Sequence, residues 1–397
     1  MRILVLTFYY PPDLSAGAPR MAGLVDALRE RVPPESTIDV ITTQPNRYAS
    51  FVVEAASHEE RAGVSIRRIA LGRHKSGMID QSLAFARFAR GANAATVTQR
   101  YDLVVASSSR LMTAVLGAWI ARQTKAKLYL DIRDIFVDTI QDVLGGIISR
   151  PVEYISQSLE RFALRRAAKV NLVSPGFLEY FARRYPTQRF SCFTNGVDSE
   201  FLQAGPQTPG PLPRRAGAGT LTLLYAGNIG EGQGLHLILP MLATQLDGKV
   251  RFHVVGDGGR RPELEAALRA AGATNVTLLS PVGRERLLEL YCAADVLFLH
   301  LNDYPAFEKV LPSKLFEYAA LGKPVLAGVG GFSADFVREE IPNAKVFRPC
   351  DVAGALEALK GLKLEETPRS AFVAKYGRAA ICRRMADDVL SLMACEA

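Results

Sequence analysis

The sequence lacks the long apolar runs that cross membranes. None of its hydrophobic segments reaches the roughly 18–20 residues that a transmembrane helix needs. The apolar part of residues 1–8 is too short for a signal peptide, and no small-residue cleavage site follows it. We therefore expect residues 1–8 to form a first buried strand.

Cysteine and histidine are scarce as well. The 397 residues include five of each, and no two cysteines form a Cys-x-x-Cys pair. An odd number of scattered thiols argues against a disulfide framework and favours a reducing cytosol. Because the histidines are equally dispersed, no metal site is predicted.

Acidic residues are outnumbered in the first half of the chain. Residues 1–200 carry 26 lysines and arginines against 19 acidic residues, which gives +7 of the total net charge of +8. Residues 61–100 hold eight basic residues and one acid, Asp80. This pattern suits membrane headgroups, a lipid-linked phosphate or nucleic acid, and a merely solvated basic face is the alternative. Nucleic acid is disfavoured because aromatic residues do not interleave with the cluster as a stacking platform.

Short β-branched runs alternate with amphipathic stretches through the whole chain, as in parallel sheets with crossover helices. The length exceeds what one core usually supports, so we expect an α/β protein with two Rossmann-like domains. Residues 201–219 are dense in proline and glycine and predict a linker between domains at 1–200 and 220–369. Strands are expected at 3–8, 38–42, 64–69, 103–106, 127–130, 170–173, 190–193, 221–225, 251–255, 276–279, 296–300, 324–327 and 345–347.

Glycine-rich turns follow several of these strands. Gly17 lies in the loop after the first strand, and residues 225–235 contain four glycines before an apolar helix. Backbone amides in such turns can cradle a phosphate, although a tight strand–helix connection would also use glycine. Residues 254–260 are similar, but Arg261 replaces the third glycine of Gly-x-Gly-x-x-Gly, which argues against a nicotinamide dehydrogenase.

The most informative segment begins near Pro312 and Ser313, which can start a helix. Its first amides and Lys314 could face a diphosphate. Glu317 lies one turn further on the same face, where a carboxylate could accept both hydroxyls of a ribose. An exposed ion pair is the alternative, but the uncharged and aromatic neighbours predict a largely buried helix.

Together these segments resemble glycosyltransferase family 4, and the resemblance covers nearly the whole chain. It implies the GT-B fold, with two parallel-sheet domains facing an interdomain cleft and a final helix, residues 370–397, packing back on the first domain. Residues 131–136 are similar to the Arg-Asp stretch of a subgroup that builds O-antigen and capsule, including N-acetylfucosamine transferase-like members. The motifs that carry the resemblance are the Tyr-Pro-Pro…Gly loop ending at Gly17, Val173-Ser-Pro-Gly176, Thr194-Asn-Gly-Val-Asp198, Tyr225-Ala-Gly-Asn228, Val254-Val-Gly-Asp-Gly258 and Pro312-Ser-Lys-x-x-Glu-Tyr-Ala-x-x-Gly-Lys-Pro324.

The resemblance implies a retaining glycosyltransferase that needs no cofactor. Because no Asp-x-Asp motif lies in a suitable loop, we expect it to be metal-independent. It uses a nucleoside diphosphate sugar, UDP-linked and with an N-acetylated sugar among the candidates. Glu317 matches the glutamate that binds ribose, Lys314 a lysine near the phosphates, and Gly17 the loop glycine near the diphosphate. The expected catalytic residues are Arg133, Asp134 and Lys314. The expected donor-binding residues are Gly17, Gly227, Asn228, Gly256, Lys309, Ser313, Lys314, Leu315 and Glu317.

Two places depart from the family pattern. Asn228 and Gln233 stand where many members carry arginine and lysine for the pyrophosphate, so other cations such as Lys314 must neutralise it. Lys309 occupies the first position of the usual Glu-x7-Glu pair. Glu308 lies one residue away, and its sugar-binding role is a hypothesis.

The resemblance also gives the basic segment a role. In similar enzymes a basic face of the first domain docks on the inner membrane, where a polyprenyl-diphosphate-linked saccharide acceptor resides. A cytoplasmic, peripheral enzyme of lipopolysaccharide or O-antigen synthesis is therefore expected. Two alternatives stay open: a sugar-nucleotide epimerase of the same architecture, and a non-catalytic sugar-nucleotide-binding protein. The expected docking residues are Arg73, Lys75, Arg87 and Arg90, with Leu83, Phe85 and Phe88 dipping into the interface.

Overall fold

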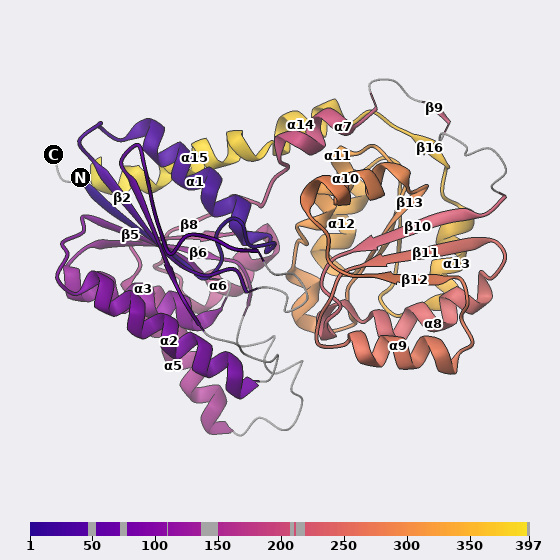
Figure 1. The fold of residues 1–397 in the computed structure, drawn as a ribbon, viewed down its shortest axis with the longest axis horizontal. Helices are drawn as coiled ribbons and strands as arrows, with labels where there is room; N and C mark the ends of the chain where they lie inside the picture. The colour runs from indigo at the N-terminus through magenta and orange to yellow at the C-terminus, as the bar shows by residue number, and fades with distance from the viewer. Residues whose placement is uncertain are drawn as a thin grey trace. The chain divides into compact units, whose positions relative to one another are not determined.

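The structure is a computed structural model that describes residues 1–46, 53–71, 78–108, 110–135, 150–206, 210–211 and 219–394. The chain divides into two compact units (Figure 1). Unit 1 comprises Met1–Asn195 and Arg378–Ala397, and unit 2 comprises Gly196–Gly377. Within the described residues, no helix has the length and apolar character that crossing a membrane requires.

Unit 1 is built on an eight-stranded sheet in the order β3-β4-β2-β1-β5-β6-β7-β8. Neighbouring strands are parallel except for the hairpin of β3 and β4. The central strands are apolar on both faces, as expected for a parallel sheet covered on both sides. The strands are β1 (Arg2–Thr7), β2 (Thr37–Thr43), β3 (His58–Arg61), β4 (Val64–Ile69), β5 (Leu103–Ser108), β6 (Lys127–Ile132), β7 (Lys169–Leu172) and β8 (Phe190–Ser191).

Helices cover both faces of this sheet (Figure 1). On one face α1 (Gly17–Arg31) and α15 (Arg378–Ala394) pack side by side, and their apolar residues share a core with Ile3 and Val5 of β1. The other face carries α2 (Met78–Thr96), α3 (Leu111–Thr124) and α5 (Arg150–Arg166). The short helices η2 (Pro175–Phe177) and α6 (Leu178–Arg184) lie between β7 and β8 in the chain.

Unit 2 contains a six-stranded parallel sheet in the order β12-β11-β10-β13-β14-β15. A two-stranded antiparallel ribbon of β9 and β16 stands apart from it. The strands are β9 (Gly210–Pro211), β10 (Leu221–Ala226), β11 (Val250–Val255), β12 (Val276–Leu279), β13 (Val296–His300), β14 (Val325–Gly328), β15 (Ala344–Phe347) and β16 (Glu365–Glu366).

Two apolar cores flank the sheet of unit 2. One gathers α7 (Ser199–Ala204), α10 (Arg284–Ala293), α11 (Lys314–Ala320), α12 (Gly331–Glu340) and α14 (Ser370–Tyr376). The other gathers α8 (Leu235–Gln245), α9 (Arg261–Ala270) and α13 (Val352–Lys360). The 3-10 helices η3 (Glu231–Gln233) and η4 (Pro305–Lys309) lie in the loops after β10 and β13.

The predicted α/β class with two parallel-sheet domains is confirmed. The chain leaves unit 1 after Asn195 and returns to it at Arg378. Within the expected returning segment, residues 370–397, α14 therefore belongs to unit 2, because Phe372 packs on the rings of Phe316 and Phe336. Only α15 completes unit 1.

Candidate functional site

In unit 2, two glycine turns follow β10 and β11 and pack directly on each other. The Ile229 amide donates to the carbonyl of Asp257 at 2.9 Å, and the Gly227 amide is bonded to the end of β11. A Cβ on Gly256 would overlap the carbonyl oxygen of Gly227, and one on Gly258 would crowd Ile229. Gly256 and Gly258 therefore permit close contact between the backbones of the two turns. The amides of Gly227 and Ile229 in the first turn donate hydrogen bonds within the protein.

The two residues at the departure from the family pattern stabilise this turn. The Asn228 side chain donates to Gln233 Oε1 at 2.8 Å, and the amide of Gly230 donates to the same oxygen at 3.2 Å. The Tyr225 hydroxyl also donates to the carbonyl of Asn228 at 2.6 Å. Asn228 and Gln233 thus replace charge with a hydrogen-bonded turn.

His300, at the end of β13, is hydrogen-bonded to the same turn. Its Nδ1 lies 2.6 Å from the carbonyl oxygen of Gln233, and its Nε2 accepts from the Cys350 amide at 2.9 Å. Burial lowers the pKa of His300 to about 4. The neutral imidazole therefore joins the glycine turn to the loop after β15.

Lys314, Glu317 and Tyr291 form a compact polar cluster at α11 and α10. Glu317 Oε2 accepts from Lys314 Nζ at 2.9 Å and from the Tyr291 hydroxyl at 3.0 Å, and Lys314 also reaches that hydroxyl at 3.1 Å. The side chains of Lys314 and Glu317 are 26% and 15% exposed, so this is not the solvated pair of the alternative interpretation. Glu317 Oε1 has no hydrogen-bond partner among the described residues, and it can accept one from a ligand.

Tyr291 was not anticipated from the sequence. It is fully buried, and burial followed by the charge of Glu317 raises its pKa well above the ordinary value. Tyr291 therefore stays protonated and donates to the carboxylate. Nothing in the sequence near residue 291 marks this contact, because 26 residues separate Tyr291 from Glu317.

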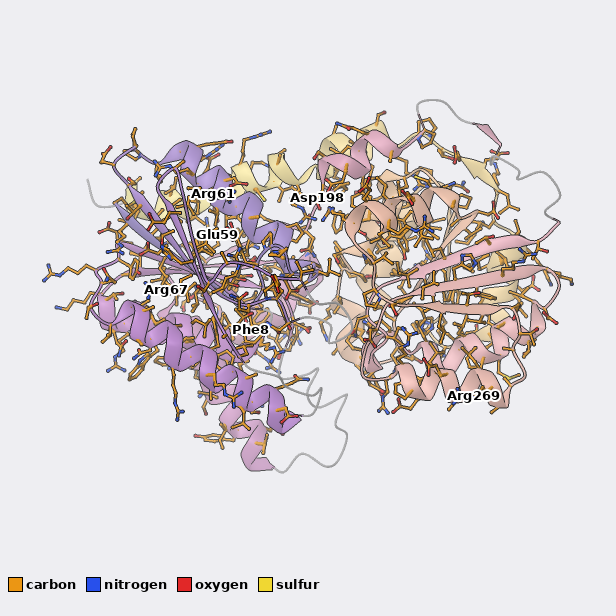
Figure 2. The ribbon with its side chains drawn as sticks, in the orientation of Figure 1. Phe8, Glu59, Arg61, Arg67, Asp198 and Arg269 are labelled. Carbon is orange, nitrogen blue, oxygen red and sulfur yellow. The ribbon has the colours of Figure 1, made fainter. Side chains whose placement is uncertain are left out.

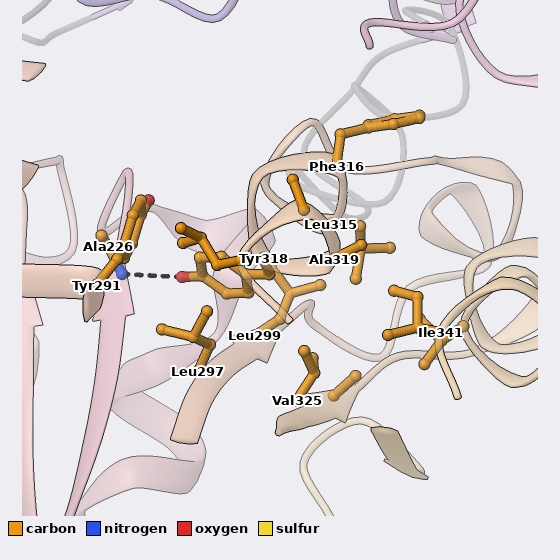
Figure 3. Close-up of a cluster of buried hydrophobic side chains, with 14 of the residues drawn as sticks. Ala226, Tyr291, Leu297, Leu299, Leu315, Phe316, Tyr318, Ala319, Val325 and Ile341 are labelled. Carbon is orange, nitrogen blue, oxygen red and sulfur yellow. Dashed lines mark hydrogen bonds between the residues drawn. The ribbon is translucent and has the colours of Figure 1, made fainter. Parts of the chain in front are cut away.

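The short helix α11 holds the cluster in place. Leu315, Phe316 and Tyr318 are fully buried, and the Tyr318 hydroxyl accepts from the amide of Ala226 at 3.2 Å (Figure 3). The expectation of a largely buried helix is confirmed. Ser313 occupies the position immediately before α11.

Glu308 and Lys309 lie in η4, separated from α11 by residues 310–313. The Glu308 side chain is exposed, and its backbone carbonyl lies so close to Gly331 that a Cβ there would overlap it. Within the described residues, no hydrogen bond joins Glu308 to the Lys314–Glu317 cluster. Its sugar-binding role stays a prediction.

In unit 1, a fully buried ion pair lies at the end of β6. Asp131 accepts two hydrogen bonds from Arg20, at 2.9 and 3.1 Å, and one from Asn171 at 2.8 Å. Burial would raise the pKa of Asp131, but Arg20 lowers it below its ordinary value. Sequence analysis missed this pair. The sequence did hold a signal for a buried Arg20. It lies four residues before Leu24 and eight before Leu28, so the three side chains share the apolar face of α1.

The structure brings the predicted residues Gly17 and Arg133 together. The Arg133 guanidinium lies over Gly17, where a Cβ would overlap it. Burial, and then the charges of Arg20 and Arg378, lower the pKa of Arg133 to about 10, against the opposing charge of Asp131. The glycine thus admits an arginine to a region rich in positive charge, which suits an anion.

The other predicted residue of this stretch, Asp134, accepts from the amide of Ile135 at 2.9 Å. This bond is local, between adjacent residues. A catalytic role for Asp134 stays a prediction.

Two of the four predicted membrane-docking residues lie within the described part of the chain. Arg73 and Lys75 lie outside the described residues, whereas Arg87 and Arg90 are exposed on α2. Arg87 donates to the carbonyl of Leu71 at 2.6 Å.

The expectation that Phe85 and Phe88 dip into a membrane is wrong. Both are buried, and the ring of Phe88 packs edge-on at 5.2 Å from that of Phe8. They lie on the core face of α2, opposite its arginines. Leu83 is 52% exposed.

The basic segment is also partly neutralised. Arg61, labelled in Figure 2, pairs with Asp26 at 3.2 Å. Arg68 pairs with Glu59 at 2.6 Å. These acids lie outside or at the edge of residues 61–100, so the local charge count overstates the positive field there.

Family models of known proteins match both halves of the chain. Residues 15–196 match the model described as glycosyl transferase 4-like domain, and residues 220–363 match that of glycosyl transferases group 1. Both halves of the chain therefore match models of glycosyltransferase domains. The N-acetylfucosamine subgroup stays a prediction.

Curated relatives are similar over part of their lengths. A 2-deoxystreptamine glucosyltransferase of Streptomyces kanamyceticus is 28% identical over 195 residues, which is 47% of this chain and 49% of that protein. A lipopolysaccharide 1,2-N-acetylglucosaminetransferase of Salmonella typhimurium is 23% identical over 239 residues, 56% of this chain and 62% of that protein. The chain thus spans about half the length of the first and under two thirds of the second.

Solved structures match over nearly the whole chain. Anabaena Alr3699/HepE in complex with UDP-glucose has a TM-score of 0.66 at 16% identity, covering 98% of this chain and 99% of that chain. The lipopolysaccharide outer core galactosyltransferase WaaB has a TM-score of 0.61 at 12% identity, covering 98% and 99%. The predicted GT-B fold is confirmed.

Proposed function

We propose that this protein transfers a sugar from a nucleoside diphosphate sugar to a glycan acceptor in the synthesis of bacterial surface polysaccharide, with retention of anomeric configuration. Its two glycosyltransferase domains support the reaction class. The observation that carries the donor assignment is the half-buried Lys314–Tyr291–Glu317 cluster, in which one carboxylate oxygen remains available.

Glu317 is assigned to the ribose of the donor. Its Oε2 is fixed by two donors, so the carboxylate cannot rotate freely and Oε1 is directed by the protein. A preorganised acceptor of this kind binds hydroxyl groups at a lower entropic cost. Lys314, beside it, supplies positive charge for the diphosphate.

Arg133 is assigned to the charge that develops on the leaving diphosphate. A fixed, partly desolvated guanidinium stabilises such charge better than a solvated one, and it does so without a metal. Gly17 lets the guanidinium lie against the backbone. We assign no catalytic base.

A UDP-linked donor, an N-acetylated sugar and a lipid-linked acceptor are the finer parts of the proposal. The solved relative with bound UDP-glucose supports UDP, and the N-acetylglucosaminetransferase of lipopolysaccharide supports the sugar and pathway class. A polyprenyl-diphosphate-linked acceptor would place the protein at the cytoplasmic face of the cell membrane.

The test has two steps. First, calorimetric titration with UDP, ADP and GDP and their sugars identifies the donor. Second, transfer is followed as nucleotide release with lipid-linked acceptor, comparing the wild type with Glu317→Gln and with the control Glu285→Gln. We expect Glu317→Gln to lose at least about tenfold in donor affinity, since hydrogen bonds to charged groups contribute about 1.5–3 kcal/mol.

Other outcomes reject the proposal. Epimer formation from the donor alone would indicate an epimerase, and donor binding without transfer to any acceptor would indicate a non-catalytic binding protein. Unchanged donor affinity in Glu317→Gln would remove the ribose assignment.

A further inference from the structure

Two hollows adjoin on the helical face of unit 1. The first, here the arginine hollow, has a volume of about 540 Å³ between α3 and α5. The second, here the tryptophan groove, has about 410 Å³ and is lined mainly by apolar side chains of α2 and α3, with Arg90. Phe162 lines both. The arginine hollow is lined by Arg122, Ser158, Arg161, Phe162, Arg165 and Arg166.

The arginine hollow concentrates positive charge. Four guanidiniums line it, and among the described residues no carboxylate does. Arg166 donates to the carbonyls of Ala121 and Ala126, at 3.2 and 3.3 Å. Arg122, Arg161 and Arg165 form no ion pair with any residue in the described ranges. Four like charges around one hollow repel each other unless an anion lies among them.

The tryptophan groove presents large apolar side chains to solvent. Trp119 is 47% exposed and Met112 is 39% exposed, and both line the groove. Tryptophan is enriched at membrane interfaces, where its ring meets both acyl chains and headgroups. An exposed apolar groove of this kind marks an interaction site.

We propose that the two hollows together bind an anionic phospholipid of a bilayer. Its phosphate lies among Arg122, Arg161 and Arg165, and its acyl chain passes Phe162 towards Trp119. This inference deepens the membrane part of the proposed function. It extends the docking surface from α2 to the outer face of α3 and α5 (Figure 1). Of the residues expected to dock, Arg90 and the buried Phe85 line the tryptophan groove. No predicted donor-binding residue lines either hollow.

Trp119 provides a direct measurement because it is the one tryptophan of the chain. Vesicles of equimolar phosphatidylcholine and phosphatidylglycerol should shift its fluorescence to shorter wavelength, and vesicles of phosphatidylcholine alone should not. An unchanged spectrum with the anionic vesicles, or an equal shift with both kinds, overturns the proposal.

Vesicle sedimentation with charge variants tests the arginine hollow. The double variant Arg161→Gln/Arg165→Gln should partition about 30-fold more weakly, since each arginine near an anionic surface contributes roughly a factor of five. The matched control Arg251→Gln/Arg269→Gln removes two exposed arginines of unit 2, of which Figure 2 labels Arg269, and should bind as the wild type. Equal loss in both double variants would indicate a general charge effect and reject the site.

Two further arms complete the test. If glycerol phosphate binds the wild type but not Arg161→Gln/Arg165→Gln while anionic vesicles bind neither, the hollow takes soluble anions and the membrane proposal fails. Donor titration of Arg161→Gln/Arg165→Gln should match the wild type, so failure of the lipid site is distinguishable from failure of the donor assignment.

Discussion

At the scale of single residues, a tyrosine hydroxyl holds a charged pair in place and a histidine imidazole joins two backbone loops. Tyr291 donates to Glu317 from a fully buried position, and His300 joins two loops as a neutral ring. Neither was anticipated, because their partners are distant in sequence. What the sequence did indicate was the Lys314–Glu317 spacing, since residues three apart on a helix meet.

Replacing Tyr291 by phenylalanine tests its positioning role. The variant removes the hydroxyl bonded to Glu317 and Lys314 but keeps the ring. We expect donor affinity to fall about fivefold, because one hydrogen bond contributes about 1 kcal/mol. Calorimetric titration with the donor measures this, with Tyr154→Phe, at a 70% exposed side chain, as the control. Equal affinities in the two variants would contradict the role.

His300 makes the stability of the protein depend on pH. Between about pH 4 and 6.5 the unfolded chain binds a proton at this residue and the folded chain does not, so stability rises with pH in that window. The stabilisation is complete above about pH 6.5 and is lost as the pH falls towards 4, by about 3 kcal/mol in all.

Urea unfolding at about pH 7 and about pH 4.5 measures this effect. His300→Gln should show a smaller loss of unfolding free energy on acidification than the wild type. The exposed His58→Gln is the control and should keep the wild-type slope. An unchanged slope in His300→Gln would refute the assignment.

The buried pair of Arg20 and Asp131 gives the largest expected effect of a single side chain. Asp131→Asn leaves the Arg20 charge buried without its counter-charge, so the free energy of unfolding should fall by about 4 kcal/mol. Glu179→Gln, which breaks a pair with both side chains about four-fifths exposed, should cost about 0.5 kcal/mol. Chemical denaturation compares the two, and similar losses would show that the buried pair is not needed.

At the scale of elements, the pattern of apolar residues predicted the ends of most strands to within one or two residues, because buried parallel strands are apolar on both faces. It missed β3 since the residues His58–Arg61 are all polar and lie at a sheet edge. It also misjudged α2. Phe85 and Phe88 share the core face of that helix, while Arg87 and Arg90 lie on the other. A basic helix with aromatic residues is therefore insufficient evidence for membrane insertion.

The contact between the two glycine turns predicts a sharp difference between neighbouring glycines. Gly256→Ala should destabilise unit 2 by about 3 kcal/mol, because its Cβ would overlap the carbonyl of Gly227 and overpacking costs about 1–3 kcal/mol or more. Gly259→Ala is the control, since nothing lies within 4 Å of a Cβ there. Thermal unfolding distinguishes them, and equal midpoints would contradict the contact.

At the scale of the whole molecule, composition and alternation were enough to predict two parallel-sheet domains. The place where the chain changes units was harder to predict. The proline- and glycine-rich composition of residues 201–219 predicted a linker there, but Phe201 of α7 is already buried in unit 2. Composition reports local flexibility, whereas membership of a unit depends on packing partners far away in the sequence.

The course of α15 affects how the chain folds as it is made. Met385 and Val389 of this helix fill the core of unit 1 beside α1, yet the ribosome adds them only after all of unit 2. Residues 196–377 are contiguous and can fold as soon as they emerge. Until α15 is synthesised, residues 1–195 expose the apolar face that this helix later covers. This first segment is therefore the part of the nascent chain that most needs a chaperone.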